Sequence, residues 1–113
     1  MQEGRLQKLL DFLAAEPNDE FLQYALATEY LRLNDIDNAL AYYGKLISEH
    51  PNYFGTYYHL GKLYEKLGRK DEAISTYQKG MQVTREQRNN HAFSELQGAY
   101  NQLSGLYDDD DEE

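Results

Sequence analysis

The chain has 113 residues, a net charge of −9 and no cysteine. A single domain of this size can bury roughly two thirds of its unfolded surface, and the lack of cysteine excludes disulfide bonds and thiolate metal sites. No apolar stretch is long enough to span a bilayer and nothing at the N-terminus has the pattern of a signal peptide, so we expect a cytoplasmic protein with no membrane partner.

Negative charge gathers at the C-terminus, where residues 108–113 are all acidic. Of the 20 acidic residues, this leaves 14 against 11 basic ones in the rest of the chain, a net charge of −3. Because like charges repel, residues 108–113 are expected to form a disordered acidic tail, either solvated, folded back on basic side chains or loosely bound to cations. The near balance elsewhere argues against a nucleic-acid partner.

The first predicted helix spans about residues 6–15 and stops before Pro17. Its leucines keep to one helical face, at positions Leu6, Leu9, Leu10 and Leu13. Asn18 or Asp19 can cap the second helix, because a short side-chain oxygen accepts the unpaired amide hydrogens of a first turn. The second helix should end at Asn34, and Asp37 should lie in the first turn of the third.

The second and third helices then recur with a period of 34 residues. Pro17-Asn18 returns as Pro51-Asn52, and Asn34 aligns with Gly68, another residue that tolerates the left-handed conformation at a helix end. Other aligned pairs are Tyr24 and Tyr58, Leu26 and Leu60, Tyr30 and Tyr64, Ala39 and Ala73, and Tyr43 and Tyr77. Such a period is typical of helical solenoids, in which each unit buries its apolar face against its neighbours.

Beyond residue 81 the match weakens, since Arg85 stands where a third proline would fall. A last helix is still predicted, because large apolar residues share one face at Phe93, Leu96, Tyr100 and Leu103. Polar residues around it are typical of a terminal helix that caps a solenoid.

The repeated residues resemble the tetratricopeptide repeat family. Its small and aromatic positions are matched in both units, by Leu26-Ala27, Tyr30, Ala39 and Tyr43, then by Leu60-Gly61, Tyr64, Ala73 and Tyr77, whereas Gln23 departs from a large apolar position. The resemblance implies an all-α fold, a right-handed α-α superhelix of two full helix-hairpin repeats between an N-terminal helix and a C-terminal capping helix. The expected domain is 1–107, with repeat one at 20–53, repeat two at 54–87 and the capping helix at 88–106.

The resemblance also implies a concave groove lined by the first helix of each repeat. Mapped onto this chain, its best-placed residues are Phe21, Tyr24, Thr28, Arg32, Tyr58, Lys62 and Lys66. Exposed aromatic side chains in a concavity can anchor a partner segment, although the same tyrosines could equally pack against each other between helices. The cations suit an acidic peptide, and ordinary solvated surface residues would account for them as well.

No catalytic activity, cofactor or metal site is expected. The three histidines do not form a pair at four-residue helical spacing, and neither a phosphate loop nor a nucleophile motif is present. The carboxylate clamp that some family members use to hold chaperone C-termini is not expected either, because its positions read Tyr24, Thr28, His59, His91 and Glu95.

Two functional hypotheses follow. The first is a non-catalytic protein–protein interaction module, a monomer or weak homo-oligomer, that binds a peptide segment of another protein in its groove. The alternative is a structural protein that self-associates through an exposed helix face, for which Tyr42, Tyr53 and Phe54 are the candidates.

Overall fold

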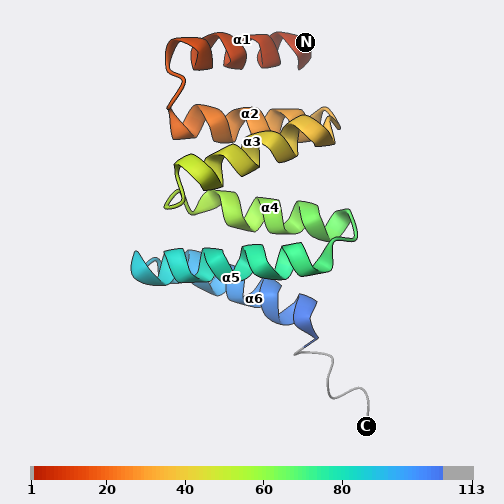
Figure 1. Ribbon diagram of the computed structural model, residues 1–113, viewed down its shortest axis with the longest axis vertical. Coiled ribbons are helices and arrows are strands. Elements are labelled where there is room, and N and C mark those ends of the chain that lie inside the picture. The colour runs from red at the N-terminus through yellow and green to blue at the C-terminus, as the bar shows by residue number, and fades with distance from the viewer. Residues whose placement is uncertain (1, 106–113) are drawn as a thin grey trace. The chain divides into compact units, whose positions relative to one another are not determined.

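The computed structural model describes residues 2–105, and within this range the chain forms six α-helices and no β-strand (Figure 1). In chain order the helices are α1 (Gln2–Ala15), α2 (Glu20–Arg32), α3 (Ile36–Glu49), α4 (Gly55–Lys66), α5 (Lys70–Glu86) and α6 (Asn90–Ser104). The expected all-α helical repeat fold is confirmed. The predicted acidic tail at 108–113 lies outside the described residues.

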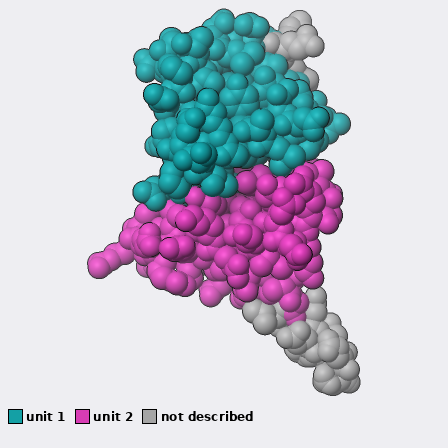
Figure 2. Space-filling view, in the orientation of Figure 1, with its two compact units in different colours: residues 1–56 teal, residues 57–113 magenta. Residues whose placement is uncertain are grey.

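The chain divides into two compact units, residues 1–56 and residues 57–113, which Figure 2 colours separately. Unit 1 holds α1, α2 and α3, and unit 2 holds α5, α6 and most of α4. The boundary falls in the first turn of α4, so the two predicted repeats lie largely in different units. The single domain expected over 1–107 stays a prediction.

Short polar side chains fix the starts of three helices. Asp19 caps α2 by accepting a hydrogen bond from the backbone N–H of Leu22 at 2.9 Å, as predicted. Asp35 and Asn89 cap α3 and α6 in the same way. Arg69 occupies the equivalent position before α5 and makes no side-chain cap. The start of α5 therefore lacks the local stabilisation that the other three receive.

Left-handed residues end α2, α4 and α5. Asn34, Gly68 and Arg88 have φ angles of 64°, 75° and 59°. In each turn the following residue donates its N–H to the carbonyl five residues earlier, at 2.8 to 2.9 Å. The sequence predicts the first two turns but not the third, because arginine seldom adopts positive φ. This third turn lets α5 run past Arg85 and joins α6 to it by only three residues.

The core of unit 1 lies between α2 and α3. Its fully buried apolar residues are four that the repeat pattern marks, Leu26, Ala27, Ala39 and Tyr43, together with Leu46, which the pattern does not mark. Gln23, the departure from that pattern, is fully buried as well. Its side-chain amide donates to the carbonyl of Pro17 at 3.0 Å and to Glu49 Oε1 at 3.2 Å. These hydrogen bonds from Nε2 offset part of the cost of burying a polar group, whereas Oε1 of Gln23 has no hydrogen-bond partner among the described residues.

The core of unit 2 is formed by all three of its helices. The buried apolar residues are Tyr57, Leu60, Leu63, Ala73, Tyr77, Val83, Ala92, Leu96 and Ala99. Two glycines allow the close approach of α4 and α5. A Cβ atom at Gly61 would overlap the ring of Tyr77, and one at Gly80 would lie 2.6 Å from the Cβ of Tyr57. The small position predicted at Gly61 thus admits no side chain at all.

Candidate functional site

The four predicted groove residues of unit 1 follow one face of α2 at spacings of three and four. Phe21 is 60% exposed. Tyr24 is half-buried, and its ring centroid lies 5.5 Å from that of Tyr53 in the α3–α4 connection. Thr28 is exposed, with its hydroxyl 3.4 Å from the hydroxyl of Tyr43. This face therefore combines an exposed ring, a packed ring and a hydroxyl group.

Arg32, the fourth residue, is held by a buried carboxylate that the sequence analysis overlooked. The side chain of Glu29 is only 3% exposed and accepts hydrogen bonds from Arg32 at both oxygens. Arg5 of α1 lies 3.0 Å from Glu29 Oε1. The hydrogen bond from Arg32 lowers the pKa of Glu29 against the opposing effect of burial. The three-residue spacing of Glu29 and Arg32 is the signal that could have revealed this pair.

The three predicted groove residues of unit 2 follow one face of α4 at four-residue spacing. Tyr58 is half-buried, and Lys62 Nζ lies 5.6 Å from its ring centroid. The same nitrogen lies 3.8 Å from Glu65 Oε2. Lys66 is exposed, and it forms no ion pair with any residue between 2 and 105. Of the three predicted cations, Lys66 alone keeps its charge uncompensated within the described chain.

Glu65 serves two partners at once. Besides Lys62, it accepts a hydrogen bond of 2.5 Å from the hydroxyl of the fully buried Tyr77. Burial, followed by this hydrogen bond, raises the pKa of Tyr77, so the hydroxyl stays protonated. Glu65 therefore links α4 to α5 and also pairs with Lys62 of α4.

The residues considered for self-association lie in unit 1. Tyr42 stacks on Tyr30 with 5.7 Å between ring centroids, and Tyr53 packs on Tyr24. Phe54 is 42% exposed. Two of the three candidates thus contact rings of their own unit.

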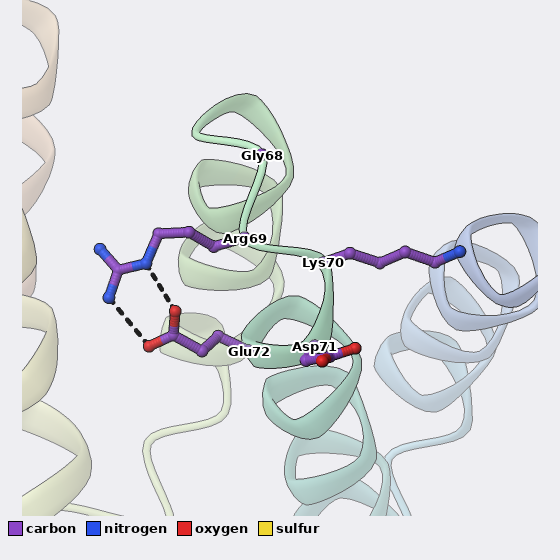
Figure 3. Close-up of a pocket in the computed structure, with 5 residues that line it drawn as sticks. All are labelled: Gly68, Arg69, Lys70, Asp71 and Glu72. Atoms are coloured by element: carbon purple, nitrogen blue, oxygen red, sulfur yellow. Dashed lines mark hydrogen bonds and ion pairs between the residues drawn. The ribbon is translucent and has the colours of Figure 1, made fainter.

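A shallow hollow of about 330 Å³ opens where α5 begins, lined by residues 68–72 (Figure 3). The guanidinium of Arg69 donates to both carboxylate oxygens of Glu72, at 2.5 and 2.9 Å, while Lys70 points the opposite way. Arg69 also lies 5.0 Å from the ring centroid of Tyr64. This hollow was not predicted from the sequence. Of its four charged residues, Arg69 and Glu72 pair with each other, whereas Lys70 and Asp71 form no ion pair within the described residues.

The remaining described residues offer few side chains that could form a metal or catalytic site. Within residues 2–105, no three histidine, aspartate or glutamate side chains are arranged to hold a metal ion. His91 lies 3.3 Å from Glu95 one turn along α6, as an exposed pair. None of the six helices has both the length and the apolar character needed to cross a bilayer. The predicted groove residues of α2 and α4 present aromatic rings, hydroxyl groups and cations, which are suited to non-covalent contact.

Solved structures similar to this chain include proteins from Salinibacter ruber and Bordetella parapertussis. A tetratricopeptide repeat domain protein from Salinibacter ruber, determined in solution by NMR, is 49% identical, with 80% of this chain and 91% of that one covered and a TM-score of 0.76. A crystal structure of such a domain from the same organism has 49% identity, coverages of 78% and 99% and a TM-score of 0.74. A Bordetella parapertussis protein, 21% identical, shares the fold, with coverages of 88% and 86% and a TM-score of 0.75.

Comparison with the curated proteins gives no match. The sequence model of the tetratricopeptide repeat matches residues 24–87, which is more than half of the chain. That stretch includes both copies of the small and aromatic positions, Ala39 and Tyr43 with Ala73 and Tyr77. Together with the structural relatives, the match shows that the chain belongs to the tetratricopeptide repeat family.

Proposed function

We propose that the chain is a non-catalytic interaction module that binds peptide segments of a partner protein, on the exposed face of α2 in unit 1 and on that of α4 in unit 2. Repeats of this family generally mediate protein–protein interaction. The observation that carries the proposal is Phe21, a large apolar side chain left 60% exposed beside Tyr24 on the face that the resemblance assigns to partners. Aromatic residues in such positions are the usual energetic anchors of interfaces.

The charge of the bound segment is proposed from α4. Lys62 and Lys66 lie one turn apart, with Tyr58 one turn before them. An acidic segment would find the charge of Lys66 uncompensated and could compete with Glu65 for Lys62. Arg32 contributes less to this attraction, because Glu29 already binds it.

The proposal is tested by capturing partners from native cell extract with the full chain and with a Tyr24→Ala, Tyr58→Ala double variant. Loss of two anchor rings should weaken binding about tenfold or more. Circular dichroism should show the same helical content, since both rings are only half-buried.

The matched control is the Tyr42→Ala, Tyr100→Ala double variant, which removes one half-buried ring from each unit but from other helices. It should capture the same partners as the parent. If the Tyr24 and Tyr58 variant binds as well as the parent, the assignment of these faces is wrong.

Self-association is the alternative function, and the exposed ring of Phe54 is the observation that favours it. Light scattering over a concentration series separates the two proposals. Dimers that Phe54→Ser dissociates would support the alternative, whereas a monomer at every concentration would contradict it.

A further inference from the structure

Three aromatic side chains mark the place in unit 1 where α2 begins and α3 gives way to α4. Phe21 lies one turn before Tyr24 on α2, and the ring of Tyr24 packs on that of Tyr53. Tyr53 is held in place by its backbone, which donates to the carbonyl of His50 at 3.0 Å and accepts from the N–H of Thr56 at 3.3 Å. We call Phe21, Tyr24 and Tyr53 the aromatic corner.

Two carboxylates border the aromatic corner. Asp19 and Glu20 directly precede Phe21, and both raise the pKa of Tyr53, after the larger effects of burial and of Tyr24. Glu20 Oε1 lies 3.4 Å from Nδ1 of His50. Within residues 2–105 neither carboxylate forms an ion pair with a lysine or an arginine. The corner is thus an apolar surface with a negative border.

In unit 2, cationic side chains of the chain itself lie over half-buried aromatic rings. Cations lie 5.0 to 5.6 Å from three of its ring centroids, Lys62 over Tyr58, Arg69 over Tyr64 and Arg85 over Phe93. In the described part of the chain, no lysine or arginine lies over the ring of Phe21 or of Tyr53. A cation placed there would gain both the attraction of the ring face and that of a carboxylate.

We propose that the aromatic corner binds a positively charged segment of a partner protein, with an arginine or lysine side chain lying on a ring and pairing with Glu20. Arginine fits best, because its planar guanidinium stacks on a ring while donating to a carboxylate. The inference rests on the proposed function, since Phe21 and Tyr24 belong to both surfaces. It assigns a basic contact to α2, in contrast to the acidic contact proposed for α4.

Two fluorescein-labelled peptides probe the charge preference. One carries three Arg-Leu pairs between Gly-Ser spacers, and its twin has glutamate in place of each arginine. The arginine peptide should shift the amide NMR signals of residues 19–24 and 53–55 of the full chain. The glutamate peptide should leave those signals unchanged.

Matched variants locate the contact. Phe21→Ser should raise the Kd for the arginine peptide about tenfold. Phe12→Ser, which removes a phenylalanine that is 59% exposed on α1, should change that Kd by less than about twofold. Glu20→Gln should weaken binding about fivefold and reduce its dependence on salt. Asp37→Asn removes a first-turn carboxylate from α3 instead and should have no effect.

Equal binding of the two peptides overturns the proposal, as does arginine-peptide binding that survives both Phe21→Ser and Glu20→Gln. Binding lost only when residues 108–113 are changed to their amides would place the attraction in the acidic tail and overturn it too. The proposed function can still hold if the aromatic corner does not bind the arginine peptide. An extract partner lost with the Tyr24 and Tyr58 variant would still support it, even if the arginine peptide does not bind.

Discussion

Units 1 and 2 use the same helix hairpin with different chemistry at equivalent positions. Tyr43 and Tyr77 are one period apart and both fully buried. The hydroxyl of Tyr43 meets the hydroxyl of Thr28, whereas that of Tyr77 donates to the carboxylate of Glu65. The repeat therefore fixes where the ring packs and leaves the polar partner of its hydroxyl free to differ.

Charge separates the units further. Glu29 is buried in unit 1 between two arginines, and one period later Leu63 is buried in its place. Residues 1–56 hold nine acidic and four basic residues, a net charge of −5, whereas residues 57–105 of unit 2 hold five and seven, a net charge of +2, and residues 106–113 add six acidic residues. The helical parts of the two units thus differ in net charge, so each can favour a different kind of ligand contact.

The largest effect expected from this comparison is at the small position, Ala27 in unit 1 and Gly61 in unit 2. Gly61→Ala should lower the free energy of unfolding by about 1–3 kcal/mol, because the added methyl overlaps the ring of Tyr77. Ala27→Gly should cost only about 1 kcal/mol, through the flexibility of glycine in a helix. Urea denaturation measures both, and a neutral Gly61→Ala would contradict the close packing in unit 2.

A smaller effect is expected at the two buried hydroxyl groups. Tyr77→Phe should cost about 1–2 kcal/mol, because Glu65 loses a hydrogen bond to its charged oxygen. Tyr43→Phe should cost less than about 1 kcal/mol, since both partners of that contact are neutral. The same urea series compares the two variants. Equal costs would show that the carboxylate adds nothing to the contact in unit 2.

The smallest change in stability at neutral pH is expected for Glu29→Leu, which gives unit 1 the leucine that unit 2 has at the equivalent position, Leu63. The folded pKa of Glu29 lies below its ordinary value of 4.5, so its contribution to stability is present above that value and lost as pH falls through the lowered pKa. The variant should be about as stable as the parent at neutral pH, because exposed Arg5 and Arg32 remain hydrated.

Acid denaturation followed by circular dichroism checks this difference. The Glu29→Leu variant should lose less stability than the parent as the pH falls below 4.5. Identical acid sensitivity of parent and variant would mean that the buried carboxylate is not what distinguishes the units in acid.

The parts of the fold that depend on residue type and local spacing could be predicted from sequence. The left-handed turns at Asn34 and Gly68 are of this kind, because asparagine and glycine tolerate positive φ. Arg88 adopts the same conformation although its residue type disfavours it, so the surrounding structure must impose that turn.

The candidate site likewise has a part that could be predicted from the sequence and a part that could not. The residues of the α2 and α4 faces follow from helical spacing and family resemblance. The contact of Arg5 with Glu29 joins different helices, and the packing of Tyr53 on Tyr24 depends on the path of the α3–α4 connection. Neither contact has a local signal in the sequence, so both required the folded chain.

The turn at Arg88 also falls out of phase with the repeat. Its two counterparts, Asn34 and Gly68, are one period apart, but Arg88 follows Gly68 after only 20 residues. The family match stops at residue 87, at the start of that interruption. The link from α5 to α6, residues 87–89, is also two residues shorter than the link from α3 to α4, residues 50–54, and holds no proline. The apolar pattern of α6 therefore does not continue the 34-residue period of the two repeats.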